Sequence, residues 1–264
     1  MDINSILVWQ KFNCYRFEEK THAYYYNGSK VRYSVTQFIK RFHEEFNSEE
    51  VSKNYALKHG LKQEDVLYEW DRKGRISSSA GTAIHSYLEN AKRGKDIPFD
   101  IKSVDPDIQV EVLNRIKILL PQAKKFHEDT LNRLFPIQLE YTVGIENIIA
   151  GNIDMLCWNQ KAQEFQIWDY KNLKEFNTTN YFNKNMLGAF YWLPECHLSK
   201  YSIQLNMYKA ILQRQLNIPI GKCYLVHFDY TNPDAQFKIH ESLDLQYECN
   251  IELDRLINEV KNNV

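Results

Sequence analysis

The sequence lacks the features that would place it among secreted, membrane or metal-cluster proteins. Its five cysteines are scattered and never form a C-x-x-C pair, which argues against a disulfide framework, a zinc knuckle and an iron–sulfur cluster. No basic N-terminal stretch precedes an apolar run, so no signal peptide is expected. No apolar run approaches the roughly 20 residues that a membrane-spanning helix needs. We therefore expect a reduced, intracellular and cytoplasmic protein without a membrane partner; an organellar location stays open.

A surplus of either charge is also absent, because 33 Lys and Arg residues face 34 Asp and Glu residues, for a formal net charge of -1. The net charge thus gives no support for nucleic-acid binding, although a local basic groove attracts phosphate over about 10 Å. What the chain does contain suffices for a packed core: 264 residues, of which 44% are hydrophobic and 14% aromatic. The aromatic residues are mostly tyrosine and phenylalanine, which favours core and rim packing, with base stacking as the alternative.

The N-terminal third is expected to hold short strands and short helices. Asn27-Gly28 separates two runs rich in β-forming residues and is typical of a hairpin turn within residues 1–33. Ser34 or Thr36 is suited to begin a helix, because a side-chain oxygen at this position accepts a hydrogen bond from the backbone of the first turn. Sparse apolar positions over residues 48–73 predict two short surface helices.

The centre of the chain changes to a strand pattern. After the serine run at residues 77–79 we expect a separate helix that carries His85, and then a long helix over about 107–134, either kinked or divided at Pro121. Alternating apolar residues over 136–171 predict a three-stranded meander. The remaining elements are expected to be a helix over 199–216, strands over 224–228 and 237–239, and a helix over 243–260. This pattern predicts an α/β fold with a mixed sheet between helices.

Two neighbouring strands of the predicted meander carry acids in unusual places. Asp154 and Asp169 both lie within apolar runs, although acids are depleted in strand interiors. Asp169 and Lys171 are two residues apart, so their side chains lie on one face of the strand, and hairpin pairing would bring Asp154 opposite. Two carboxylates suit Mg²⁺ or Mn²⁺, which prefer oxygen ligands and assist the attack of water on a phosphodiester. The alternative, a surface salt bridge, is disfavoured by the apolar neighbours of both motifs.

Four motifs occur in a fixed order along the chain: Gly81-Thr82-Ala83-Ile84-His85, Gly151-Asn152-Ile153-Asp154, Asp169-Tyr170-Lys171 and Gln204-Leu205-Asn206-Met207-Tyr208. Their order and spacing resemble the PD-(D/E)XK nuclease superfamily, in particular its RecB-like exonuclease branch. The resemblance covers about residues 80–210, and the combination is far more specific than any one motif. The iron–sulfur members of that branch carry a cysteine quartet that this sequence lacks.

The resemblance implies a metal-binding or catalytic role for each matching residue. The catalytic residues would be Lys171, Asp154 and Asp169. The metal ligands would be His85, Asp154, Asp169 and the carbonyl of Tyr170. Glu140, on the preceding strand, stands at a commonly acidic position and would bind a second metal directly or through water. The implied cofactors are two Mg²⁺ or Mn²⁺ ions, without an iron–sulfur cluster.

Other matching residues would contact DNA or support the site. Gln204 and Tyr208 lie one helical turn apart and therefore share a face of their helix. Ser34, Thr36 and Trp70 are similar to residues of mitochondrial genome maintenance exonucleases and related phage proteins, a looser resemblance near the N-terminus. It implies a bacterial or phage-infected cell as the setting, and DNA as the partner; no protein partner is indicated.

Together these features predict one nuclease domain over residues 1–264. We expect a restriction-endonuclease-like core, with a central mixed β-sheet flanked by helices, plus an N-terminal helical elaboration. The divisions expected are an elaboration over 1–78, a catalytic core over 79–240 and a C-terminal helix over 241–264. The predicted function is a metal-dependent DNA exonuclease that hydrolyses phosphodiester bonds from a free, single-stranded end. Two alternatives stay open, a structure-selective endonuclease on the same core and a catalytically silent nucleic-acid-binding protein.

Overall fold

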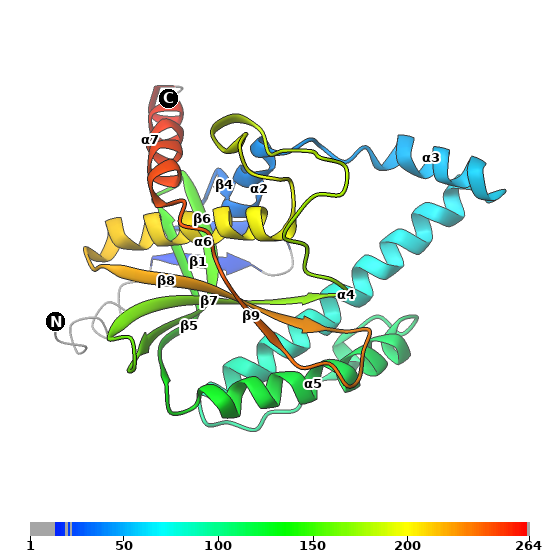
Figure 1. The fold of residues 1–264 in the computed structure, drawn as a ribbon, viewed down its shortest axis with the longest axis horizontal. Coiled ribbons are helices and arrows are strands. Elements are labelled where there is room, and N and C mark those ends of the chain that lie inside the picture. Colours follow the sequence, from blue (N-terminus) through cyan, green and yellow to red (C-terminus); the bar gives the residue numbers. More distant parts are fainter. Residues whose placement is uncertain (1–13, 19–20, 22, 263–264) are drawn as a thin grey trace.

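A six-stranded mixed sheet forms the centre of the fold (Figure 1). The structure, a computed structural model, describes residues 14–18, 21 and 23–262. The strands of the sheet are β4 (Tyr33–Ser34), β5 (Leu134–Ile145), β6 (Ile149–Asn159), β7 (Glu164–Leu173), β8 (Ile220–Asp229) and β9 (Lys238–Glu241). The main helices are α2 (Val35–Ile39), α3 (Ser48–His59), α4 (Gln63–Lys92), α5 (Gln109–Thr130), α6 (His197–Leu216) and α7 (Gln246–Asn262). The fold is therefore α/β, with an open mixed sheet flanked by helices, as the sequence pattern predicted.

The predicted three-stranded meander is confirmed by the pairing of β5, β6 and β7. β6 runs antiparallel to β5 and β7, with Tyr141 opposite Ile153 on one side and Met155 opposite Trp168 on the other, and its first residues pair in parallel with β4. The chain then crosses over through α6, so that β8 pairs with β7 in parallel, and β9 pairs with β8 in the antiparallel direction. This topology leaves β6 and β7, the two strands that carry the predicted acids, near the middle of the sheet.

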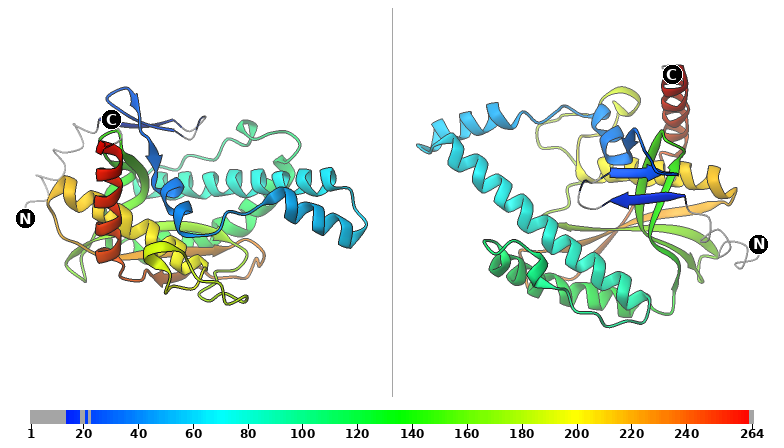
Figure 2. Two further views of the ribbon diagram at one scale, coloured as in Figure 1. Left: turned by 90° about the horizontal axis from the view of Figure 1, so that it is seen from above. Right: turned by 180° about the vertical axis from the view of Figure 1, so that it is seen from behind.

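Hydrophobic cores lie on both faces of the sheet. On one face α4 and α5 pack through residues such as Leu88 and Phe126, both fully buried. On the other face α2, α6 and α7 pack through residues such as Phe38 and Leu253. Figure 2 shows these layers from two further directions. Packing on both faces buries most residues of β6 and β7, so that an acid within these strands is exceptional.

A small separate sheet precedes the main sheet. It consists of β1 (Tyr15–Glu18), β2 (Ala23–Tyr26) and β3 (Ser29–Lys30), paired antiparallel. The predicted hairpin turn at Asn27-Gly28 is confirmed, since both residues have positive φ, at 47° and 83°, between paired β2 and β3. The part of the expected strand-and-turn region that precedes residue 14 lies outside the described residues.

The helix that carries His85 is longer than expected. α4 is one helix of 30 residues that continues without a break through the serine run at 77–79. The prediction of a second short surface helix, followed by a separate histidine helix, is therefore wrong. Ile84 and Leu88 are buried against α5 and the sheet, and this packing outweighs the weak helix propensity of serine and glycine. The division expected between residues 78 and 79 falls inside this helix.

The long helix α5 was expected to be either kinked or divided at Pro121. It runs as a single helix through Pro121, so a division into two helices is excluded, and it ends at Thr130 because β5 already begins at Leu134. The expected later helices and strands are present with ends shifted by a few residues. Within the described part of the chain, no helix combines the length and apolar character that crossing a membrane requires.

Candidate metal centre

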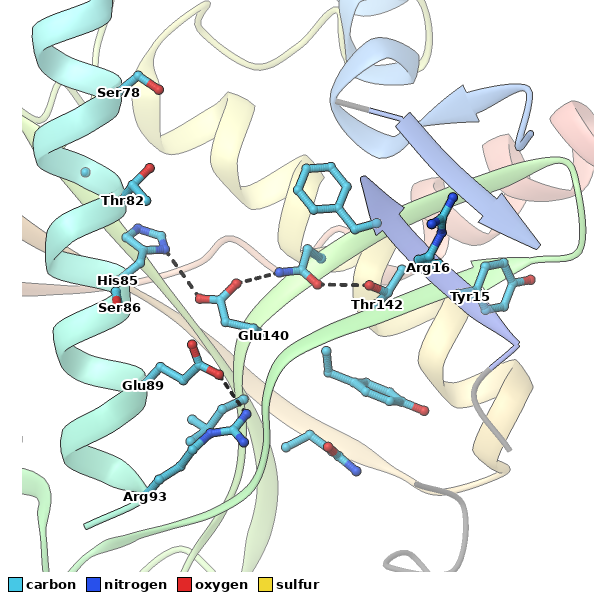
Figure 3. A pocket seen from close by; sticks show the side chains of 16 residues that line it. Tyr15, Arg16, Ser78, Thr82, His85, Ser86, Glu89, Arg93, Glu140 and Thr142 are labelled. Atoms are coloured by element: carbon cyan, nitrogen blue, oxygen red, sulfur yellow. Dashed lines mark hydrogen bonds and ion pairs between the residues drawn. The ribbon is translucent and has the colours of Figure 1, made fainter. Parts of the chain in front are cut away.

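Three side chains from three elements converge beside the sheet, and two of them, His85 and Glu140, are drawn in Figure 3. His85 comes from α4, Glu140 from β5 and Asp154 from β6, and one ligand atom of each lies within 4.8 Å of the others. His85 Nδ1 is 3.7 Å from Glu140 Oε1 and 3.5 Å from Asp154 Oδ1. Residues far apart in the sequence are thus brought together around one small volume, in which Asp154 is only 8% exposed.

The backbone of Tyr170 links this group to β7. Its N–H donates to Asp154 Oδ2 at 2.7 Å, and its carbonyl oxygen lies 3.2 Å from His85 Nε2. The first bond fixes the orientation of the Asp154 carboxylate. The second means that both ring nitrogens of His85 face oxygen atoms, so the ring is held between β6 and β7.

Asp169 and Lys171 form an ion pair next to this group. Lys171 Nζ lies 2.5 Å from Asp169 Oδ2 and 4.8 Å from the ring centre of Tyr201 on α6. The two side chains share a face of β7, as their two-residue spacing predicted, whereas the side chains of Trp168 and Tyr170 pack in the core on the α4–α5 side. The ammonium is therefore held between a carboxylate and the face of an aromatic ring.

Burial favours the neutral form of each of these groups, whereas attraction between the acids and the bases favours the charged forms. Burial raises the pKa of Asp169 to about 6, although the Lys171 ammonium lowers it. Burial also raises the pKa of Asp154, against the attraction of His85. For His85 burial lowers the pKa, but the carboxylates of Asp154 and Glu140 outweigh it and bring the pKa to about 9. A proton on His85 therefore neutralises part of a carboxylate cluster that would equally attract a metal cation.

Glu140 is held in place by an unusual backbone and by two polar neighbours. Its φ is +50°, in the left-handed region that costs a non-glycine residue about 1–2 kcal/mol. Asn152 Nδ2 donates to Glu140 Oε2 at 2.5 Å, and Thr142 Oγ1 donates to Asn152 Oδ1 at 3.2 Å. One oxygen of Glu140 is thus occupied by Asn152, while the other faces His85.

Three residues of the site are not evident as site residues from the sequence: Asn152, Thr142 and Tyr201. Asn152 belongs to the Gly151-to-Asp154 motif, and Thr142 belongs to none of the four motifs. One sequence signal could have indicated Asn152 and Thr142, namely the two polar residues Glu140 and Thr142 on one strand. Antiparallel pairing places Thr142 directly opposite Asn152, so their side chains can contact each other. No sequence pattern indicated Tyr201, whose position beside Lys171 depends on how α6 packs on the sheet.

Gln204 and Tyr208 lie beneath the Gly151 end of β6. Gln204 Nε2 donates to the Tyr208 hydroxyl at 2.8 Å, and Tyr208 is 3% exposed. A Cβ atom at Gly151 would approach Tyr208 Cε1 to 2.4 Å, so only glycine allows the tyrosine ring to lie against the strand. This arrangement gives Tyr208 a supporting position under β6 and leaves little of it available for contact with DNA.

The three remaining candidates lie at separate places. Ser34 is the N-cap of α2, because its Oγ accepts from the Gln37 N–H at 3.0 Å, and Gln37 Oε1 in turn accepts from the Ser34 N–H at 2.9 Å. Thr36 is exposed on α2. Trp70 packs 5.9 Å from Phe46 and precedes His85 by fifteen residues of one helix, or roughly 22 Å along its axis. The structure does not bring Trp70 to the cluster.

The donor atoms fit a hard divalent cation. Two carboxylates and an imidazole form a set rich in oxygen, which suits Mg²⁺ or Mn²⁺, whereas the Tyr170 carbonyl faces the other ring nitrogen of His85. His85, Glu140 and Asp154 are the one group of three or more metal-binding side chains found among the described residues. Asp169 stands just outside this group, and its buried Oδ2 has no hydrogen-bond partner there besides its ion pair with Lys171. The cluster could therefore hold a divalent cation.

Comparison with known proteins does not assign the chain to a family. No protein-family model matches the chain, and a search among curated proteins finds no significant match.

Proposed function

We propose that this protein is a metal-dependent DNA nuclease of the PD-(D/E)XK type, in the RecB-like branch, and that its sheet and flanking helices are a restriction-endonuclease-like core. The observation that carries the proposal is the convergence of His85, Glu140 and Asp154 beside the Asp169–Lys171 pair. Buried carboxylates cost free energy unless they are paired or bind metal. A purely structural salt bridge needs one acid and one base, whereas this cluster gathers three acids.

The proposed cofactor is a pair of divalent cations, either Mg²⁺ or Mn²⁺. The residues that would hold them are His85, Glu140, Asp154, Asp169 and the carbonyl of Tyr170. When bound, such cations neutralise negative charge on the scissile phosphate and make hydroxide accessible near neutral pH.

The chain's own residues supply position and charge for an in-line attack of water on the phosphodiester. The pKa of Lys171 is raised, because the carboxylates of Asp169 and Asp154 outweigh the effect of burial, so this side chain acts as a cation that steadies the phosphate or the water. The Tyr170 N–H orients Asp154, and Asn152 orients Glu140. These groups are fixed before the substrate arrives, and such preorganised charge is usually the largest contribution to catalysis.

The proposed substrate is DNA with a free, single-stranded end, which the enzyme would degrade as an exonuclease. A cleft of about 1070 Å³ is lined by His85 and Glu140, so a bound strand would reach the cluster at these two residues. The resemblance of the motif order to the RecB-like branch favours DNA and cleavage from an end.

The test is digestion of an end-labelled single strand with Mg²⁺ or Mn²⁺. We expect progressive shortening by the parent protein and loss of at least about 100-fold in rate for Lys171→Ala and Asp154→Ala. Lys184→Ala is the matched control, because Lys184 also pairs with a carboxylate but on an exposed loop. The proposal fails if the Lys171 and Asp154 variants cut as fast as the parent.

A covalently closed single-stranded circle separates the open alternatives in the same assay. Resistance of the circle, with digestion of the linear strand, is the expected result. Cleavage of the circle would instead indicate an endonuclease on the same core. An absence of cleavage on both substrates would indicate a catalytically silent protein.

A further inference from the structure

The cleft that opens on the metal centre has two walls of different chemistry (Figure 3). α4 forms one wall and β1 the other, and the floor includes Glu140 and Asn152. Ser78, Thr82 and Ser86 follow one another at four-residue intervals, so their hydroxyls line one face of α4. Hydroxyls of this kind commonly contact the phosphates and sugars of nucleic acids.

The β1 wall presents an aromatic ring and a cation. Phe17 is half-buried, with its ring centre 4.8 Å from that of Tyr24 on the neighbouring strand, and it lines the cleft. Arg16, beside it, has a side chain that is 69% exposed. An aromatic ring at the edge of a polar cleft offers a face or edge on which a base can stack.

We propose that this cleft binds a single-stranded polynucleotide, with the sugar–phosphate backbone along the hydroxyl face of α4 and a base stacked on Phe17. Arg16, and Arg93 at the end of α4, contact phosphates. The inference rests on the proposed function and assigns the residues that recognise its substrate. From Ser78 to Arg93 the helix extends roughly 22 Å, which spans about six stacked nucleotides at 3.4 Å each.

The charges in the cleft favour an unpaired strand over a duplex. Arg93 already pairs with Glu89 at 2.7 Å, and Arg16 lies 3.8 Å from Glu18, so electrostatic attraction to phosphate is modest. Much of the affinity must then come from stacking on the aromatic wall. A base in a duplex has its faces covered by its neighbours, whereas an unpaired base offers one to Phe17.

Fluorescence anisotropy of labelled oligothymidylate in EDTA measures this binding without metal-dependent cleavage. We expect Phe17→Ala to weaken binding of a strand of about twelve nucleotides roughly tenfold. Arg16→Ala should weaken it less and should lower the slope of log affinity against log salt by about 0.7. Thr82→Asp, which places a negative charge on the exposed face of α4, should weaken it by about tenfold as well. The matched control is Arg255→Ala on α7, since its side chain is also 69% exposed and pairs with a nearby glutamate.

A blunt duplex of the same length serves as the second probe. The parent should bind it more weakly than the single strand, and Phe17→Ala should narrow that difference. Thermal unfolding of each variant checks that the hairpin sheet stays folded, and Thr82→Asp tests the opposite wall should Phe17→Ala unfold it.

The inference is overturned if Phe17→Ala, Thr82→Asp and Arg16→Ala all bind the single strand as tightly as Arg255→Ala. If the parent then still digests single strands with Mg²⁺, the proposed function stands and only the cleft is wrong. If the cleft variants lose binding while the parent cuts no substrate, the cleft assignment stands and the proposed function fails.

Discussion

α4 carries two clusters of charge about 15 Å apart along its axis, and they differ in burial and balance. At Arg75, three acids surround one guanidinium: Asp71 at 3.0 Å, Asp105 at 3.0 Å and Asp107 at 2.9 Å. Those acids have side chains between 44% and 68% exposed. At His85 two of the three acids lie inside the fold, with Asp154 at 8% and Asp169 at 3% exposure, whereas the Glu140 side chain is 30% exposed.

This difference in burial indicates that stability can account for the Arg75 cluster but not for the His85 cluster. Water solvates the acids around Arg75, so that network costs the fold little and contributes little. Asp154 and Asp169 have lost most of their water, and this burial raises the pKa of both carboxyl groups. Crowded, buried carboxylates lower the stability of the folded protein, and such destabilising arrangements are typical of functional sites.

The largest effect that separates the two clusters is expected on cleavage. His85→Ala should reduce the rate of single-strand digestion by about a hundredfold or more, because it removes a metal ligand that is held by the Tyr170 carbonyl. Steady-state digestion at saturating Mn²⁺ measures this rate. Activity of His85→Ala within a few-fold of the parent would show that the histidine is not part of the reaction.

A smaller effect is expected when the support of Glu140 is changed. Asn152→Asp keeps the shape of the side chain but replaces the amide donor with a carboxylate that repels Glu140, so Mn²⁺ affinity should fall by about 10-fold to 100-fold. Thr142→Val should have a weaker effect in the same direction, because it removes only the outer hydrogen bond. Isothermal titration calorimetry gives both affinities; unchanged binding in Asn152→Asp would contradict the role of this amide.

The buried cluster should also reveal itself in stability. In EDTA, Asp154→Asn should raise the free energy of unfolding by about 1 kcal/mol, because it removes one of several crowded carboxylates. The Asn carbonyl can still accept the Tyr170 N–H. Urea denaturation followed by circular dichroism makes the comparison, and added Mn²⁺ should stabilise the parent but not this variant. A loss of stability in EDTA would mean that the Asp154 charge is well paired without metal.

The smallest effect is expected at the exposed cluster. Arg75→Ala should lower Tm only slightly and leave cleavage unchanged, because its three acidic partners stay solvated. A thermal melt and the digestion assay check the two expectations. A large fall in activity would indicate that Arg75 contacts the substrate. The conclusion that only the buried cluster has a functional role would then be wrong.

Part of the site followed from local patterns in the sequence. The two-residue period of a strand placed Asp169 and Lys171 on one face, and the meander placed Asp154 beside them, as their ion pair and the Asp154–Tyr170 bond show. The Asn27-Gly28 turn followed from the φ values that such a turn demands. These predictions depend on residues close in sequence or on adjacent strands.

The rest depends on tertiary packing. Serine and glycine at 77–81 indicated a break, but burial of Ile84 and Leu88 keeps α4 continuous. Only that continuity reveals that Trp70 lies about four turns of helix from His85, too far away to join it. The positive φ of Glu140 likewise arises from how β5 is fitted against β6, which no residue pattern indicated.

The most direct test of the metal centre is a calorimetric titration of the purified protein with Mn²⁺. We expect saturable binding to the parent, the same binding to Arg75→Ala, and no measurable binding to a variant that combines His85→Ala with Asp154→Asn. Binding that is absent from the parent, or equally strong in that double variant, would contradict the assignment of His85, Glu140 and Asp154 as a metal centre.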